Sequence, residues 1–215
     1  MKATILDIET GARPIAEIEP LLPAITAPAN YKDAEKIRAY IEQRRAELLS
    51  DAALDATLGR VLAVGILRHD SPPQFITPDD EAALLRDTWR ELDDKAAGEI
   101  TVTFCGHRFD FPFLARRSWA LGVAVPEWFP RDGRFPRHAF YDLAELWQCG
   151  DRTETISLDR LARVLGLPGK TGDGADFARL FREDRPAALA YLENDLKLTR
   201  AIFERVSVRA TPRND

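Results

Sequence analysis

The most constraining feature of the chain is a short apolar run near its start that carries two carboxylates. Residues 4–10 read Thr-Ile-Leu-Asp-Ile-Glu-Thr, a pattern typical of a β-strand that places Asp7 and Glu9 two positions apart. Because side chains alternate between the faces of a strand, both carboxylates point the same way. Like charges that close repel, and a hard divalent cation such as Mg²⁺ relieves the repulsion. The local pattern alone leaves two interpretations open, a metal-binding strand or a strand that ends in solvated acids.

Length and composition are those of an ordinary globular protein. The chain has 215 residues, of which 45% are hydrophobic and 30% are charged, and no apolar run approaches the length of a membrane span. We expect a single domain over residues 1–206 and a flexible tail over residues 207–215. Since Cys105 and Cys149 make no disulfide framework, we also expect a reduced, cytoplasmic protein with no membrane partner.

The charge balance bears on the kind of partner. The formal net charge is −5, whereas proteins that bind duplex DNA without sequence preference are normally basic. Nucleic-acid binding is therefore not favoured by the overall balance, but it is not excluded, because a metal-loaded acidic cluster inverts the local field. Basic residues are also concentrated locally, at Arg116, Arg117, Arg131, Arg134, Arg137 and His138. For any single arginine, a solvated surface is the simpler interpretation.

Apolar strands and amphipathic helices alternate along the chain, which predicts an α/β domain. After the first strand, which we expect to end at Glu9, strands are predicted at residues 60–68, 74–77, 100–104 and 139–143. Asn30, Thr77 and Ser157 are the predicted N-caps of helices. Asp142 is either a further cap or an acid in the outer shell of a metal site.

Residues 12–58 read as an insertion between the first two strands. A proline-rich segment leads into one long helix predicted over residues 32–49. Its apolar stripe comprises Ala34, Ile37, Ile41 and Leu48. This spacing predicts a helix that packs on the domain rather than one that binds a partner. Long loops near a site often form lids or substrate walls, so Tyr31 and Lys32 are candidates to approach a substrate.

Two later segments carry further candidate metal ligands. Asp110 follows the strand at residues 100–104 and begins a helix, a position where capping and metal binding are compatible. Tyr191 and Asp195 are four residues apart on a final helix over residues 186–206, so they share one face. Ligands gather beyond the carboxyl ends of strands in open α/β sheets. Converging there, the four carboxylates would hold two metal ions suited to phosphodiester cleavage.

The glycine-rich segment at residues 169–172 contains Gly-Lys-Thr, as a nucleotide-binding P-loop does. A P-loop is excluded, because the motif needs a glycine where this chain has Val164 and because the segment follows a predicted helix rather than a strand. Lys170 remains a candidate for contact with a phosphate, and Phe109 could stack on a base. The expected substrate contacts are Thr10, Cys105, Phe109 and Lys170.

Three motifs in order carry a resemblance that spans nearly the whole chain. Asp7-x-Glu9, Phe109-Asp110 and Tyr191-x-x-x-Asp195 resemble the exonuclease motifs of the DEDD superfamily of 3′→5′ exonucleases, and the tyrosine resembles its DEDDy branch. The resemblance is closer still to the predicted exonucleases related to the proofreading domain of family B DNA polymerases. Residues 30–33, 59–63 and 169–172 share in it.

The resemblance implies a ribonuclease H-like fold with a mixed five-stranded sheet flanked by helices. It also implies two Mg²⁺ or Mn²⁺ ions bound by the four motif carboxylates, with Tyr191 orienting the attacking water and a 5′-mononucleotide as product. The chain departs from the pattern at Cys105, where proofreading relatives usually have an asparagine that contacts the substrate. A thiol is a weak hydrogen-bonding group and cannot replace an amide.

The expected function is therefore metal-dependent removal of nucleotides from single-stranded 3′ ends, with DNA preferred to RNA. One alternative is a ribonuclease that trims RNA from its 3′ end. Another is a non-catalytic nucleic-acid-binding module on the same fold. The complete set of Asp7, Glu9, Asp110 and Asp195 argues against the binding module, because such a module has no use for four converging acids.

Overall fold

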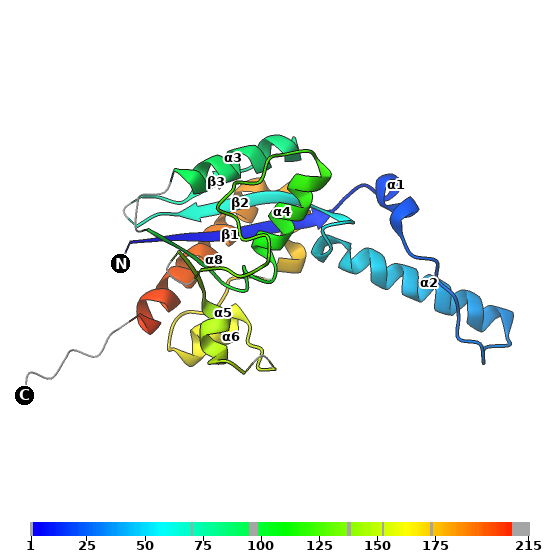
Figure 1. Ribbon diagram of the computed structural model, residues 1–215. Helices are drawn as coiled ribbons and strands as arrows, with labels where there is room; N and C mark the ends of the chain where they lie inside the picture. The colour runs from blue at the N-terminus through cyan, green and yellow to red at the C-terminus, as the bar shows by residue number, and fades with distance from the viewer. Residues whose placement is uncertain are drawn as a thin grey trace, which may run out of the picture.

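A mixed five-stranded sheet lies at the centre of the computed structural model, which describes residues 2–69, 71–94, 99–136, 139–151, 153–172 and 174–207 (Figure 1). The strand order is β3-β2-β1-β4-β5, so the first strand of the chain is the central one. The strands are β1 (Ala3–Ala12), β2 (Gly59–Leu67), β3 (Gln74–Ile76), β4 (Ile100–Thr103) and β5 (Phe140–Asp142). The α/β class and the mixed five-stranded sheet are confirmed.

The two sides of β1 are paired very differently. Along β2 the pairing is antiparallel and runs from Ile5 to Ala12, with a shift of register between Glu9 and Thr10. Along β4 the pairing is parallel and ends at Ile5. The predicted end of the strand at Glu9 is wrong, because the long antiparallel ladder carries β1 on to Ala12. The two acids thus lie within the strand, beyond the last residue that pairs with β4.

Helices cover both faces of the sheet. They are α3 (Glu81–Asp93), α4 (Asp110–Ala120), α5 (Leu143–Gln148), α6 (Leu158–Val164), α7 (Phe177–Glu183) and α8 (Arg185–Val206). Ile5 packs in one core with residues of α6 and α8, whereas Leu6 and Ile8 pack in a second core with α3 and α4. Because side chains alternate along a strand, Asp7 and Glu9 face the α8 side.

Aspartates start several of these helices. Asp80 accepts hydrogen bonds from two backbone N–H groups in the first turn of α3, and Asp33 does the same for α2 (Ala34–Ser50). The predicted caps Asn30 and Thr77 are wrong, because each helix begins three or four residues further on, where a carboxylate reaches the free N–H groups. Ser157 caps α6 as predicted.

Residues 13–58, between β1 and β2, include an arm that projects from the domain (Figure 1). We call residues 22–50 the arm; they comprise an extended segment and α2. Before the arm come α1 (Ile15–Ile18) and the 3₁₀ turn η1 (Glu19–Leu21), and after it comes the 3₁₀ turn η2 (Asp51–Leu54). One long helix is present as predicted. Its predicted packing on the domain is wrong, since none of the 17 described residues of α2 is buried.

The base of the arm is fixed next to β1. Ile18, Ala52 and Leu58 form a small core of their own. The Thr10 hydroxyl donates a hydrogen bond to the carbonyl of Ala53 at 2.7 Å. The base of the arm therefore lies beside the residue that follows Glu9, at the end of the sheet to which the carboxyl ends of β1, β4 and β5 point.

The remaining expectations concern membranes and the chain's last residues. Across the described ranges, no helix combines the length and apolar character needed to span a bilayer. The predicted tail over residues 207–215 lies outside the described residues, apart from Ser207. The sequence patterns do not predict α5 or α7, because helices of six and seven residues are too short to show a clear periodicity.

A buried ion pair joins α3 and α4, which pack on the same face of the sheet. The Glu81 carboxylate accepts hydrogen bonds from the Arg117 guanidinium at 2.9 and 2.8 Å, and one of its oxygens also accepts the N–H of Val61 in β2 at 2.9 Å. The side chains of Arg117 and Glu81 are only 5% and 9% exposed. Arg117 is therefore part of the core, and it does not add to the local concentration of basic charge expected around residues 116–138.

We predict that Glu81→Ala destabilises the protein by about 3–5 kcal/mol, because it leaves a buried guanidinium without its partner. The change is measured as the free energy of unfolding in urea. Arg90→Ala serves as a control, because Arg90 pairs with Asp87 on the exposed face of α3 and should cost less than about 1 kcal/mol. Equal effects of the two substitutions would contradict a structural role for the buried pair.

Candidate active site

Three carboxylates meet between the middle of β1 and helix α8. Oxygen atoms of Asp7, Glu9 and Asp195 all lie within 4.8 Å of one another. The first two come from alternate positions of one strand, and the third comes from a helix near the other end of the chain. The structure thus brings together residues that the sequence separates widely, in the grouping expected of a metal site.

Gly65 of β2 allows α8 to approach the sheet closely enough for this meeting. Gly65 pairs with Asp7 across the β1–β2 ladder. A Cβ atom at this position would lie 2.7 Å from Cδ1 of Leu196 and 3.0 Å from Cγ of Leu192, both on α8. Asp195 immediately precedes Leu196. A glycine inside an apolar strand is the sequence signal of such an approach, although on its own it does not reveal which element comes close.

Asp110 reaches the site from the opposite face of the sheet. It is the first residue of α4, and its Oδ1 accepts the backbone N–H of Ile8 at 3.1 Å. This N–H is available because the pairing of β1 with β4 ends at Ile5. Asp110 therefore lies against the backbone between the two β1 acids. It does not belong to the group formed by Asp7, Glu9 and Asp195, whose oxygen atoms all lie within 4.8 Å of one another.

The acids destabilise one another's ionised forms. Burial raises the pKa of Asp7 to about 7, and the neighbouring Asp195 adds to the shift. Burial raises the pKa of Glu9 well above its usual value, as does the charge of Asp7. The pKa of Asp110 is raised by the same two causes. Burial of several carboxylates at one place produces this pattern, and a cation bound among them would lower these pKa values.

Lys170 supplies the positive charge that the structure places at the cluster. Its Nζ lies 2.6 Å from Oδ2 of Asp195 and 5.0 Å from the centre of the Tyr191 ring. Burial raises the pKa of Asp195, and the ammonium opposes that shift. One ammonium near four carboxylates leaves most of the repulsion uncompensated.

The loop that carries Lys170 follows α6 and is held by Asp159. The Asp159 carboxylate accepts the backbone N–H of Lys170 at 2.8 Å and also pairs with Arg163. Because the loop follows a helix, as predicted, it lacks the strand context of a P-loop. The role of Asp159 is not apparent in the sequence, since an acid on a short helix usually faces solvent.

Tyr191 lies one helical turn before Asp195 and borders the cluster. Its side chain is 6% exposed, and a Cβ atom at Gly172 would lie 3.1 Å from the ring. Burial raises the pKa of the phenol above its usual value, and the charges of Asp195 and Glu9 add to the shift. The hydroxyl therefore stays protonated and can donate a hydrogen bond, but it cannot serve as a general base.

The donor set fits a hard divalent cation. Oδ1 of Asp195 and the hydroxyl of Tyr191 are both buried and have no hydrogen-bond partner among the residues that the structure describes. Every candidate ligand is a carboxylate oxygen, the type of ligand that Mg²⁺ and Mn²⁺ prefer. Asp7, Glu9 and Asp195 would hold such an ion directly, and Asp110 would complete the set from the other side of β1.

The other expected substrate contacts differ in their positions. The Thr10 hydroxyl is bound to the carbonyl of Ala53 and so is directed at the base of the arm. The Phe109 ring packs on Phe113, with the ring centres 5.4 Å apart. Among the expected basic surface residues, Arg116, Arg131 and Arg134 are exposed, whereas Arg137 and His138 lie outside the described residues.

Cys105 occupies a strained position in the loop after β4. Its φ of 62° lies in the left-handed region, which asparagine and glycine tolerate better than other residues. Its N–H donates to Asp142 at 3.0 Å. Burial raises the pKa of the thiol to about 11, and the charge of Asp142 adds to the shift. The thiol therefore remains neutral at physiological pH.

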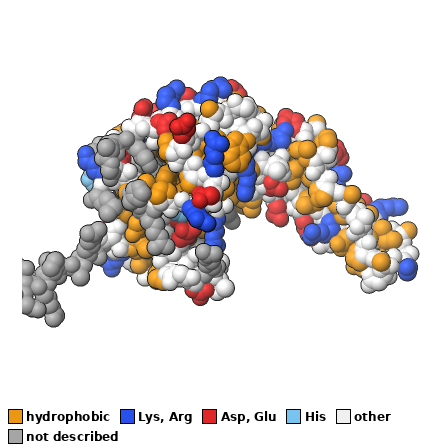
Figure 2. Space-filling model, viewed as in Figure 1, with side chains coloured by type: hydrophobic (Ala, Val, Ile, Leu, Met, Phe, Trp, Pro, Cys, Tyr) orange, Lys and Arg blue, Asp and Glu red, His pale blue; other side chains and the backbone are white. Residues whose placement is uncertain are grey.

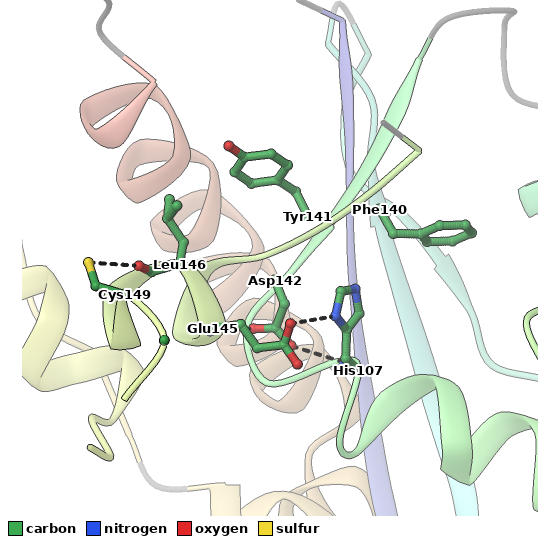
Figure 3. Close-up of a pocket in the computed structure, with 8 residues that line it drawn as sticks. His107, Phe140, Tyr141, Asp142, Glu145, Leu146 and Cys149 are labelled. Carbon is green, nitrogen blue, oxygen red and sulfur yellow. Dashed lines mark hydrogen bonds and ion pairs between the residues drawn. The ribbon is translucent and has the colours of Figure 1, made fainter. Parts of the chain in front are cut away.

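Asp142 organises a second group of polar residues at the end of β5 (Figure 3). Its carboxylate caps α5 and also accepts the N–H groups of Cys105 and His107 at 3.0 Å. Beside it, Nδ1 of His107 lies 3.0 Å from Glu145 at the edge of a cavity of 340 Å³. Of the two interpretations of Asp142, the helix cap is correct. Since backbone N–H groups bind both of its oxygens, Asp142 holds the loop after β4 in place.

Comparison with known proteins identifies the family. Residues 54–211, well over half of the chain, match the family described as "Predicted 3'-5' exonuclease related to the exonuclease domain of PolB". The chain belongs to this family. The matched part of the chain includes Asp110, Lys170, Tyr191 and Asp195, whereas β1 with its two acids precedes it. No curated protein matches the chain.

The fold of a solved structure is consistent with this family assignment. The chain is similar to the family B DNA polymerase from the hyperthermophilic archaeon Pyrobaculum calidifontis, with a TM-score of 0.62 and 17% sequence identity. The similarity covers 96% of this chain and 24% of the polymerase, so the chain spans about a quarter of that protein's length. The ribonuclease H-like fold expected from the sequence is thereby confirmed.

We predict that Cys105→Asn stabilises the protein by about 1 kcal/mol, because asparagine adopts the left-handed conformation at lower cost. The free energy of unfolding in urea measures the change. Cys105→Ser is the matched control, since it retains the strain and should bring no gain. A Cys105→Asn variant no more stable than the serine variant would contradict the assignment of strain to this position.

We predict that the metal-free protein loses stability as pH rises from about 4 to about 7. The folded-state pKa of Asp7 is raised from 3.8 to about 7, so between these values the folded form holds a proton that the unfolded form has lost. One such group removes about 1.4 kcal/mol per pH unit over that interval. Thermal unfolding in chelator across this pH range measures the effect.

Two comparisons test the cause of this pH dependence. Asp7→Asn should make the profile less steep, because one of the groups with a raised pKa is gone. Excess Mn²⁺ should remove the loss of stability, because the ion binds the ionised carboxylates of the folded form. A profile that is the same in the wild type and the variant would rule out Asp7 as the source.

Proposed function

We propose that the chain is a metal-dependent 3′→5′ exonuclease that removes nucleotides from single-stranded 3′ ends, with DNA preferred to RNA. The observation that carries the proposal is the meeting of Asp7, Glu9 and Asp195 within 4.8 Å, beside Asp110 and Tyr191. Membership of a family of predicted 3′-5′ exonucleases supports the reaction type. The relation of that family to the exonuclease domain of PolB supports DNA as the substrate.

Four acids and a phenol have distinct roles in this proposal. Asp7, Glu9, Asp110 and Asp195 would hold two Mg²⁺ or Mn²⁺ ions. When bound, such ions supply an activated water and stabilise the charge of the departing oxygen. The protonated Tyr191 hydroxyl is the hydrogen-bond donor that would orient the attacking water. Attack on the terminal phosphorus breaks its bond to the O3′ of the preceding nucleotide, and a 5′-mononucleotide leaves.

Lys170 and the residues around it would bind the substrate. With its ammonium 2.6 Å from Asp195, Lys170 lies at the cluster, where it can bind a phosphate oxygen of the terminal nucleotide. A cavity of 550 Å³ adjoins Tyr191 and is lined by Thr171, Asn194 and Lys197, among others. This cavity is large enough to accept part of a nucleotide beside Tyr191.

We predict that 5′-labelled single-stranded DNA is shortened one nucleotide at a time in the presence of Mn²⁺, with a matched RNA oligonucleotide degraded more slowly. Asp7→Asn should abolish the ladder, because the variant lacks a metal ligand. Tyr191→Phe should slow the reaction about 10²-fold, the usual cost of removing one donor that acts in the transition state. Gel electrophoresis of timed samples measures both effects.

The control is Asp94→Asn, which changes an exposed acid at the end of α3 and should leave the rate unchanged. If DNA and RNA both stay intact with Mn²⁺, the exonuclease proposal fails. Nucleic-acid binding that chelator does not affect, without turnover, would favour the non-catalytic binding module instead. Faster degradation of the RNA oligonucleotide would favour the ribonuclease.

A further inference from the structure

The tip of the arm carries a cleft that the proposed reaction does not use. The cleft has a volume of 680 Å³ and lies where the chain turns from the extended segment into α2. Its walls include Tyr31, Lys32, Lys36, Tyr40 and Gln43. Figure 2 shows the arm standing clear of the domain, with hydrophobic and charged side chains side by side along it.

Two tyrosines form the aromatic wall of this cleft. The rings of Tyr31 and Tyr40 meet edge to face, with their centres 5.7 Å apart. Tyr31 is 38% exposed although it is held by this contact. An ordered but accessible aromatic ring is the feature on which nucleic-acid bases stack, whatever their sequence.

Two lysines provide positive charge beside the rings. The ion pairs of the arm join Arg44 to Glu47 and Arg45 to Glu19, and within the described part of the chain they leave Lys32 and Lys36 with no carboxylate partner. Nearby Asp33 is engaged in capping α2, where its Oδ1 accepts the N–H groups of Glu35 and Lys36. The two ammonium groups are therefore available to bind phosphates.

The arm starts at the candidate active site and points away from it. Its base is joined to β1 through the hydrogen bond from Thr10 to Ala53, next to Glu9. The C-terminal end of α2 lies at this base and its N-terminal end lies at the tip (Figure 1). A helix of 17 residues is about 25 Å long. A strand with the stacked spacing of about 3.4 Å per phosphate needs roughly seven nucleotides to span this length, and a more extended single strand needs fewer.

We propose that the tip cleft binds the substrate strand upstream of its 3′ end, as a second contact that holds single-stranded nucleic acid while its terminus is hydrolysed. Tyr31 stacks on a base, and Lys32 and Lys36 bind phosphates. This inference rests on the proposed exonuclease function, because it requires the 3′ end of the same strand to lie at the carboxylate cluster. It adds a length requirement, since a strand of only a few nucleotides cannot reach the tip.

Fluorescence anisotropy of 5′-labelled DNA in the presence of chelator tests the proposal without any need for turnover. We expect the full chain to bind oligonucleotides of about 24 nucleotides more tightly than those of about three, which are too short to span the arm even when extended. Lys32→Gln combined with Lys36→Gln should reduce the slope of log K against log salt by about 1.4 for the long strand. Tyr31→Ala should weaken long-strand binding about fivefold or more.

The matched control combines Lys2→Gln with Arg205→Gln, which removes two exposed positive charges from the beginning of β1 and the end of α8. It should leave the salt slope unchanged. If the arm variants and this control behave alike, or if long and short strands bind equally, the proposal is overturned. It is also overturned if the arm variants change only the oligomeric state in size-exclusion chromatography, because the cleft then binds a second copy of the chain.

The same variants separate this inference from the exonuclease proposal. In the nuclease assay, the lysine variant should degrade strands of about three nucleotides at the wild-type rate, and it should be slower than the wild type only on strands long enough to reach the tip. A chain that binds long strands through the arm but releases no nucleotide would contradict the enzyme and not the arm. Circular dichroism shows whether α2 remains folded in each variant.

Discussion

Electrostatic repulsion among buried carboxylates is the constraint on which the structure around β1 depends. Asp7, Glu9 and Asp195 share one small volume, and Asp110 lies against the backbone between the first two. Burial raises the pKa values of all four groups, and the charges of neighbouring acids add to the shift at Asp7, Glu9 and Asp110. A fold that concentrates acids in this way has a cost in stability, which a bound divalent cation offsets.

The sheet and two helices on opposite faces create this concentration. Gly65 lets α8 approach from one side, so that Asp195 reaches the β1 acids. The early end of the β1–β4 pairing leaves the N–H of Ile8 for Asp110, which comes from the other side. The ion pair between Glu81 and Arg117 then ties α3 to α4, the helix that Asp110 begins.

Local patterns in the sequence predict the class of fold, the order of its strands along the chain and the residues that form the cluster. They fail where an outcome depends on a distant partner. The apolar spacing of Ile37 and Ile41 predicts a helix, but it does not say whether any part of the domain lies opposite, and α2 instead projects into solvent. Arg117 is basic in sequence and buried in the fold, because Glu81 lies 36 positions away along the chain and beside it in space.

The prediction of helix boundaries and caps from sequence is limited for a different reason. Asn30 and Asp33 are both good caps, and the choice between them depends on where the helix can begin, which a few tenths of a kilocalorie can shift. Cys105, with its positive φ, and Lys170, whose backbone N–H is bound by Asp159, both lie in loops. The geometry of these loops follows from contacts made after the strands and helices assemble.

The central claim is that the carboxylate cluster is a divalent-metal site, and direct metal binding tests it best. Electron paramagnetic resonance of free Mn²⁺, during titration with the protein, counts the bound ions. The account predicts two Mn²⁺ ions per chain in the wild type and the loss of at least one in Asp195→Asn. A wild-type chain that binds no Mn²⁺ in metal excess, or an Asp195→Asn variant that binds as many ions as the wild type, would contradict it.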